Sequence, residues 1–155
     1  MQSRCVSCFY DDQGRDPIGF ALGSIEGRVA IQYVSPNIPT SQNFAFKCHR
    51  KSNSVYPVNS IDFHPKFGTF STSGGDGGFN FWDKDSKQRL KQFNTACTSI
   101  SVGKFNANGE IFGYAVSYDW CEGIQGFNPD MKNVILLRKV MDNEIKSRSR
   151  NNRRK

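Results

Sequence analysis

Hydrophobic and polar residues alternate along several short segments of the chain, and turn-forming residues separate these segments. The alternation is clearest in residues 79–83, FNFWD, which follow the stretch SGGDGG, and it recurs in residues 133–140, NVILLRKV. A period of two places successive side chains on opposite faces of a β-strand. The 13 Phe residues and the frequent Gly also favour strands and tight turns, whereas long helix-forming runs are scarce. The pattern therefore predicts an all-β protein.

The strand pattern is repeated along the chain. Residues 4–34 and 58–85 share one order of strands and turns, with SIEGRVAIQY matching GGDGGFNFWD at an offset of 50 residues. Residues 98–120 repeat the first half of this order, and residues 43–50 and 89–94 each fit a fourth, outer strand. Four strands in each unit of about 42 to 54 residues are typical of a β-propeller blade.

This repeat defines the expected fold and its boundaries. We expect a partial WD-repeat β-propeller over residues 1–145, with about three blade-like units at roughly 4–50, 55–94 and 98–140. The glycines in EGR and DGG suit hairpin turns that need a positive φ.

The middle copy contains a candidate hydrogen-bonded relay, made of His49, Thr72, Asp76 and Trp82. In WD-repeat blades these residue types connect the outer loop to the inner strands, and an unpaired member would cost about 1–3 kcal/mol. The glycine-rich stretch beside Asp76 lacks the Gly-Lys-Ser/Thr ending of a phosphate-binding loop. It is therefore interpreted as a structural corner. The other copies are degenerate, since Gln32 stands where Trp82 stands.

The net charge of +7 belongs almost entirely to the end of the sequence. Residues 146–155, KSRSRNNRRK, contain six basic residues and no acidic one, which leaves 15 basic against 14 acidic side chains elsewhere. Such a segment is expected to be a disordered basic tail that contacts phosphate or an import receptor, or that only aids solubility. No apolar run has the 18 or more residues of a membrane span, and the first residues contain no signal-peptide core.

The chain offers few groups for catalysis or metal binding. Its five cysteines are odd in number and scattered, and the pair Cys5 and Cys8 lacks two further ligands for zinc, so we expect reduced thiols, no metal and no cofactor. Neither His49 nor His64 lies in a motif with a nucleophile and an orienting acid. Asp119 and Glu122 flank a loop and define no acid–base pair. The sequence therefore predicts no catalytic residues and no enzyme.

Several motifs together resemble one known family. They are GFALGSIEGRVAIQYV, FAFKCHR, YPVNSIDFHP, FNFWDKD and SYDW, and the resemblance that they carry covers residues 4–140. This set is similar to the mRNA export factor family, WD-repeat propellers of the nuclear pore. The sister family of mitotic checkpoint propellers shares SIEGRVA and AFKCHR, whereas FWDKD and SYDW favour the export factors.

The resemblance implies that only part of the family fold is present. The family forms a seven-bladed propeller of about twice this length, and the chain resembles its C-terminal blades. An open arc of blades would expose sheet edges and apolar faces at both ends. The chain is then a fragment, a truncated product, or one part of a split protein, and it is expected to need a complementing chain or to self-associate.

The resemblance also implies two binding surfaces. Members of both families bind a short GLEBS motif, and the basic residues that match the family's contacts with its acidic groups are Arg28 and Lys47. Without the resemblance, Arg28 would be interpreted as an exposed turn residue. A second, nucleic-acid-binding rim is implied at Trp82, Lys84, Lys87 and Arg89. An aromatic ring beside cations suits base stacking and phosphate neutralisation, although a buried relay tryptophan and a solvated outer strand would explain the same residues.

These features predict a non-enzymatic interaction platform in mRNA export. It would bind the GLEBS motif of a Phe-Gly-repeat nucleoporin and recruit single-stranded RNA, in the nucleus, at the nuclear envelope and nuclear pore complex, with shuttling to the cytoplasm. The alternatives are a spindle-checkpoint adaptor that binds kinase GLEBS peptides, an RNA-binding protein that acts through residues 146–155, and a non-functional remnant.

Overall fold

The protein consists of antiparallel sheets that follow one another along the chain, as described for residues 2–11 and 13–147 by a computed structural model. The first sheet has the order β1 (Ser3–Tyr10), β2 (Pro17–Ser24), β3 (Arg28–Tyr33), β4 (Phe44–Lys47). The second has the order β10 (Gln88–Gln92), β9 (Phe79–Asp83), β8 (Phe70–Gly74), β7 (Val58–Phe63). The third has the order β11 (Ile100–Phe105), β12 (Ile111–Val116), β13 (Val134–Lys139). The all-β prediction is confirmed, and the sheets are consistent with a partial WD-repeat propeller.

Short elements join these sheets. The hairpin of β5 (Arg50–Lys51) and β6 (Ser54–Val55) links the first sheet to the second. Two 3-10 turns, η1 (Thr40–Gln42) and η2 (Gly123–Gly126), lie in the loops before β4 and β13. The hairpin turns follow the glycines, with φ of 60° at Gly27 and 74° at Gly77. A Cβ atom at Gly77 would lie 2.7 Å from the carbonyl oxygen of Thr98, so the turn requires glycine for space as well as for φ.

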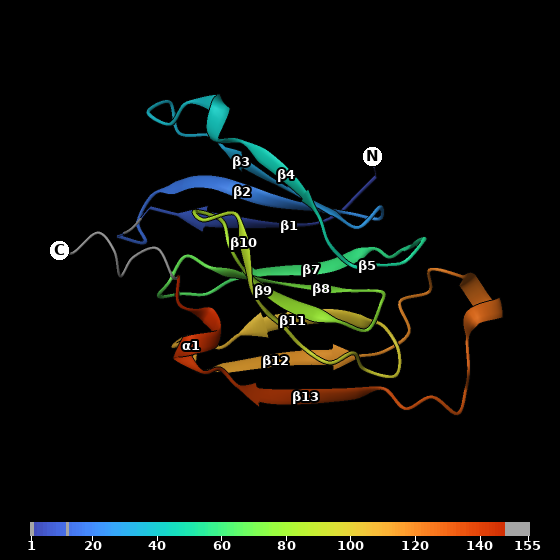
Figure 1. Cartoon of the computed structure of the whole chain (residues 1–155). Coiled ribbons are helices and arrows are strands. Elements are labelled where there is room, and N and C mark those ends of the chain that lie inside the picture. The colour runs from blue at the N-terminus through green and yellow to red at the C-terminus, as the bar shows by residue number, and fades with distance from the viewer. Residues whose placement is uncertain (1, 12, 148–155) are drawn as a thin grey trace.

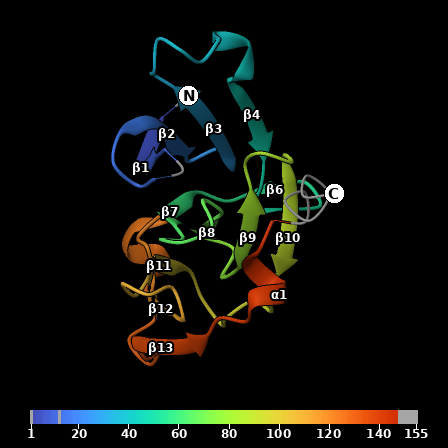
Figure 2. The ribbon, with the colours of Figure 1, turned by 90° about the vertical axis from the view of Figure 1, so that its left-hand side faces the viewer.

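The core lies in two apolar layers between the stacked sheets. Figures 1 and 2 show the sheets in chain order, and their first strands β1, β7 and β11 lie side by side. One layer, which includes Val29 and Ile31 of β3 and Phe70 of β8, joins the first sheet to the second. The other joins the second sheet to the third and is largely aromatic, with Phe81 and Phe112 fully buried. Alternation along each strand therefore buries one face against each neighbour.

The third sheet has three strands within the described residues, and a short helix follows it. Helix α1 (Asp142–Ile145) packs against β9 and β10 and buries Ile145. No helix among the described residues is both long and apolar enough to cross a bilayer. Of the basic segment 146–155, only Lys146 and Ser147 are described: Lys146 pairs with Asp142, and the Ser147 hydroxyl donates to a carboxylate oxygen of Asp83 at 2.6 Å. Residues 148–155, most of the expected tail, lie outside the described residues.

A chain of hydrogen bonds connects the four residues proposed as the relay. The Trp82 indole N–H donates to the Thr72 hydroxyl at 2.9 Å, and that hydroxyl donates to Nε2 of His49 at 2.9 Å. Nδ1–H of His49 in turn donates to Oδ1 of Asp76 at 2.8 Å, an oxygen that also accepts the backbone N–H of Gly78. Each residue of the relay is hydrogen-bonded to the next one. The relay therefore connects the linker before β5 to β8, to β9 and to the turn between these two strands.

Replacing the central hydroxyl is expected to break this relay. Thr72→Val preserves the shape of the side chain but leaves the buried Trp82 N–H and His49 Nε2 without their partner. At about 1–3 kcal/mol for each of the two unsatisfied groups, we expect the free energy of unfolding to fall by about 2–6 kcal/mol. Thr72→Ser, which loses only a methyl group, should cost about 1 kcal/mol. Urea unfolding followed by tryptophan fluorescence measures both, and equal losses would contradict the relay.

The charge of Asp76 should make the relay sensitive to acid. Burial would raise the pKa of Asp76, but the hydrogen bonds from His49 and from the Gly78 N–H lower it overall. A pKa lowered in the folded state gives stability that is present above the unfolded pKa of about 3.9 and is lost as pH falls through the folded pKa. Asp76→Asn keeps the acceptor oxygen without the charge. Its stability deficit relative to the unchanged protein should therefore shrink as the pH falls below about 4, whereas a deficit independent of pH would exclude this contribution.

Candidate peptide-binding surface

Arg28 and Lys47 lie directly opposite each other on neighbouring strands. Arg28 begins β3, immediately after the Gly27 turn, and Lys47 ends β4, where the two residues are register partners. Both side chains are exposed, and among the described residues no carboxylate forms an ion pair with either of them. Like charges directly opposite on a sheet repel each other. This arrangement therefore favours a ligand that brings negative charge.

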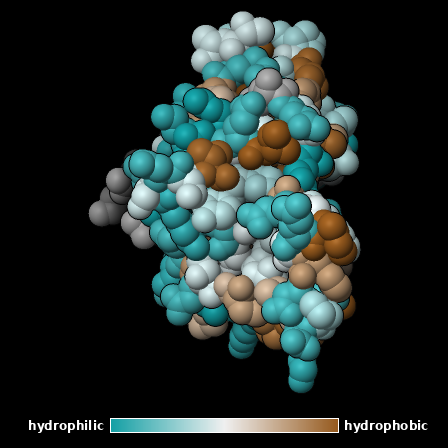
Figure 3. Space-filling model, turned by 90° about the vertical axis from the view of Figure 1, so that its right-hand side faces the viewer, coloured by the Kyte–Doolittle hydropathy of each residue, from teal (hydrophilic) through white to brown (hydrophobic). Residues whose placement is uncertain are grey.

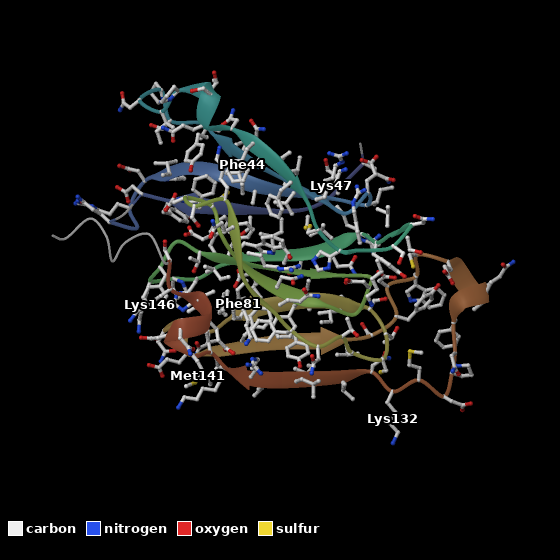
Figure 4. The ribbon with its side chains drawn as sticks, in the orientation of Figure 1. Phe44, Lys47, Phe81, Lys132, Met141 and Lys146 are labelled. Atoms are coloured by element: carbon white, nitrogen blue, oxygen red, sulfur yellow. The ribbon has the colours of Figure 1, made fainter. Side chains whose placement is uncertain are left out.

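A third cation lies at the same end of the first sheet. The Arg50 guanidinium donates to the carbonyl oxygens of Glu26 at 2.8 Å and Gly27 at 3.4 Å, so it is fixed against the turn that precedes Arg28. We call Arg28, Lys47 and Arg50 the basic corner. Figure 4 shows Lys47 at the end of β4. Figure 3 views this end of the molecule, where hydrophilic groups predominate and apolar groups form separate patches.

An aromatic seam joins β4 to the second sheet beside this corner. The seam consists of Phe44, Phe46 and Trp82, with 4.6 Å between the ring centroids of Phe46 and Trp82. Lys87 lies over the Phe44 ring at 4.8 Å, and Arg89 lies over Trp82 at 5.9 Å. Trp82 therefore packs against one aromatic ring and one guanidinium while its N–H serves the relay. A nucleic-acid base would have to displace Arg89 before it could stack there.

Lys84 is directed away from the other members of the predicted rim. Its ammonium pairs with Asp85 at 2.7 Å and lies 5.2 Å from the ring centroid of Phe9, with only 10% of the side chain exposed. It lines a cleft of about 520 Å³ together with Tyr10, Asp11 and Lys66. In loop 84–87, the side chain of Lys84 therefore points toward β1 and that of Lys87 points toward β4. The structure brings Trp82, Lys87 and Arg89 together and separates Lys84 from them.

The remaining titratable residues considered in the sequence have structural contacts. His64 is buried: its Nδ1 accepts the backbone N–H of Lys66, and its Nε2–H donates to the Gly109 carbonyl at 3.1 Å. Burial lowers the pKa of His64, which keeps the ring neutral as this pattern of bonds requires. The Asp119 carboxylate accepts from the side-chain amide of Asn59 at 2.9 Å. These bonds hold loops together.

Three residues that contact the candidate surface were missed in the sequence, namely Phe44, Phe46 and Arg50. The alternation in FAFK signals that Phe44 and Phe46 share a strand face, and β4 does turn both rings toward the second sheet. Arg50 had no comparable signal, because its position depends on the two-residue strands of the β5–β6 hairpin.

Curated relatives align with nearly the whole chain. No family model matches the chain. It is 51% identical over 152 residues to the mRNA export factor GLE2 of Chaetomium thermophilum, an alignment that covers 95% of this chain and 41% of that protein. It is 49% identical over 156 residues to the mRNA export factors of Sus scrofa and Danio rerio, covering 96% of this chain and 42% of each of them.

The stacked antiparallel sheets and the relay belong to an all-β chain that is consistent with a partial WD-repeat propeller. The chain belongs to the mRNA export factor family. It spans about two fifths of the length of the curated relatives that it matches.

Proposed function

We propose that the chain is a docking module in mRNA export, acting at the nuclear pore by binding an acidic peptide at the basic corner. The observation that supports this proposal is the register pair of Arg28 and Lys47, two exposed cations that face each other without a carboxylate partner among the described residues. The names of its relatives support the role in export.

The physical chemistry of the basic corner suits a carboxylate-bearing segment. An arginine fork donates two parallel hydrogen bonds to a carboxylate, and a nearby ammonium can neutralise a second acidic group. Arg50 is anchored by backbone carbonyls, and the strand ends that carry Arg28 and Lys47 are fixed by the sheet, so little backbone ordering remains to be done on binding. We propose a GLEBS peptide of a Phe-Gly-repeat nucleoporin as the ligand. The mechanism is docking, with no bond chemistry.

Charge reversal at the basic corner tests this function. Calorimetry with a nucleoporin GLEBS peptide should show saturable one-to-one binding, and Arg28→Glu combined with Lys47→Glu should weaken it by about a hundredfold or more. The reversed pair still places like charges opposite each other, so the stability of the sheet should change little. The matched control, Lys91→Glu combined with Lys139→Glu, changes the net charge equally on exposed residues elsewhere.

Three results would contradict the proposal. Retained affinity in the double variant would exclude this surface. Tighter binding of a checkpoint-kinase GLEBS peptide than of the nucleoporin peptide would favour an adaptor of the spindle checkpoint. Absence of binding by the folded, soluble chain would favour a non-functional remnant.

We also propose that RNA contacts the protein through phosphate groups at Lys87 and Arg89. Both side chains are exposed and lie on the β9–β10 hairpin, whereas Trp82 already contacts Phe46 and Arg89. Phosphate contacts of this kind are independent of sequence and sensitive to salt. Lys84 contributes little here, because it already pairs with Asp85.

Salt titration separates this surface from the basic segment at the end of the chain. Lys87→Glu with Arg89→Glu should weaken binding of several unrelated single-stranded RNAs alike. It should also reduce the slope of log affinity against log salt by about 0.7 for each lost phosphate contact. The same titration on a chain that lacks residues 148–155 provides the comparison. Loss of all binding on this deletion, with no effect of the double variant, would assign RNA binding to the terminal segment.

A further inference from the structure

The cleft that Lys84 lines lies between turns of the first and second sheets. One wall is the β1–β2 turn, and the other consists of the β7–β8 turn, residues 64–68, and the start of loop 84–87. Phe9 and Phe63 line it between these walls, with 5.2 Å between their ring centroids. Its volume of about 520 Å³ is within the range of about 300–1,000 Å³ that is typical of ligand clefts. Both walls come from four-stranded sheets that pack directly against each other.

Each wall of the cleft carries a carboxylate. Oδ1 of Asp11 accepts the backbone N–H groups of Gln13 and Arg15 at 3.2 and 2.8 Å, so this carboxylate is held in the β1–β2 turn. Asp11 forms no ion pair with any residue that the structure describes. On the opposite wall the side chain of Asp85 is 53% exposed, although one of its oxygens contacts Lys84. The cleft therefore offers a carboxylate on both sides to a ligand that brings positive charge.

The two cations that line the cleft leave this character in place. The Lys84 ammonium is compensated by Asp85 and is turned toward the Phe9 ring. Lys66 is at the edge of the cleft, on the β7–β8 turn, and it also lines a second cleft of about 270 Å³ whose other wall includes Asp142 of α1.

The chain itself leads from α1 to this cleft. Lys146, the residue after α1, lies 5.3 Å from the ring centroid of Phe67 in the β7–β8 turn. The Ser147 hydroxyl donates to Asp83, and the cleft begins at the next residue of that strand end, Lys84. Figure 1 shows α1 at the end of the sheets opposite the β5–β6 hairpin, and Figure 4 shows Lys146 there. Residues that follow Ser147 therefore start at the edge of the cleft.

The sequence that follows has the charge that the cleft requires. Residues 148–155, RSRNNRRK, contain four arginines, one lysine and no acidic residue. Eight extended residues reach roughly 26–29 Å, so length does not limit their access to either wall. Attachment to the same molecule gives an effective concentration of about mM, so contacts that are weak one by one are sufficient. Arginine also binds carboxylates through two parallel hydrogen bonds.

We propose that residues 148–155 dock in this cleft of the same molecule, with arginine side chains bound to the carboxylates of Asp11 and Asp85. Docking holds these arginines against carboxylates and so withholds them from phosphate groups. The cleft is thus an internal competitor for any phosphate-bearing ligand of the basic segment. The basic corner lies at the opposite end of the sheets, so this inference does not depend on peptide binding there.

Amide NMR spectra of the full chain and of a chain that lacks residues 148–155 test the proposal. Deletion should shift the amide signals of Gly14 and Gly68, one on each wall of the cleft. The signals of Gly27 and Gly77 should not move, because their turns lie at the other end of the sheets. The shifts should be the same at every protein concentration, because the docked segment belongs to the same molecule.

Removal of the two charges separates docking from other effects of the deletion. Asp11→Asn combined with Asp85→Asn preserves the shape of both side chains, and an asparagine oxygen still accepts the hydrogen bonds of the β1–β2 turn. In this variant the deletion should no longer shift the two cleft glycines, whereas a shift caused by the new chain end would persist. The matched control, Glu122→Gln combined with Asp130→Asn, changes the net charge equally at exposed positions in the loop before β13.

Trypsin cleavage after Arg148 and Arg150 gives a second measurement on the complete chain. The cleavage rate follows the fraction of molecules in which the segment is released, so the cleft variant should be cut about tenfold faster than the unchanged chain. The control variant should be cut at the unchanged rate.

Four results would overturn the proposal. They are unshifted signals of Gly14 and Gly68 on deletion, cleft-variant shifts equal to those of the unchanged chain, equal cleavage rates of the unchanged chain and the cleft variant, and equal effects of the cleft and control variants. A shift that grows with protein concentration would place the segment of a second copy in the cleft, and docking within one molecule would then be wrong.

Discussion

The structure depends on the burial of both faces of the second sheet. A strand with apolar residues on alternate positions can bury only one face against a given neighbour, so a four-stranded sheet with apolar side chains on both faces needs one sheet on each side. The second sheet meets this condition fully, with one apolar layer against the first sheet and a largely aromatic layer against the third. The relay adds directional bonds to the same sheet, and it extends into the linker that enters from the first sheet.

The basic corner owes its geometry to this packing. Phe46 faces the second sheet and contacts Trp82, so the next residue of β4, Lys47, is turned to the opposite face, where Arg28 is its partner. Arg28 and Lys47 are therefore placed by buried neighbours, whereas Arg50 is held by the carbonyl oxygens of Glu26 and Gly27. The repulsion between Arg28 and Lys47 costs about 0.2–1 kcal/mol. The sheet tolerates this cost, because burial of the apolar layer beneath it contributes far more to the free energy of folding.

The sequence predicted the strands well, because alternation and turn glycines are local signals. The expected outer strand in residues 43–50 corresponds to β4, and the strand in residues 133–140 corresponds to β13. Helix α1 was not predicted, since its four residues are too few to be stable alone and depend on the burial of Ile145 and the ion pair of Glu144 with Arg138. The rim of cations was predicted as one group, but loop 84–87, with Lys87 at a positive φ of 57°, directs Lys84 and Lys87 to different neighbours.

His49 adopts a left-handed backbone conformation, with φ of 48°, and its ring lies so close to Gly74 that a Cβ atom there would be 2.5 Å from Nδ1. This histidine follows Lys47 by two residues, and its side chain belongs to the second sheet while its backbone continues from the first. Under the proposed function, occupancy of the basic corner and folding of the second sheet are therefore thermodynamically linked. A peptide that held the end of β4 in place would also stabilise the relay, and a substitution that loosens the relay would weaken peptide binding from a distance.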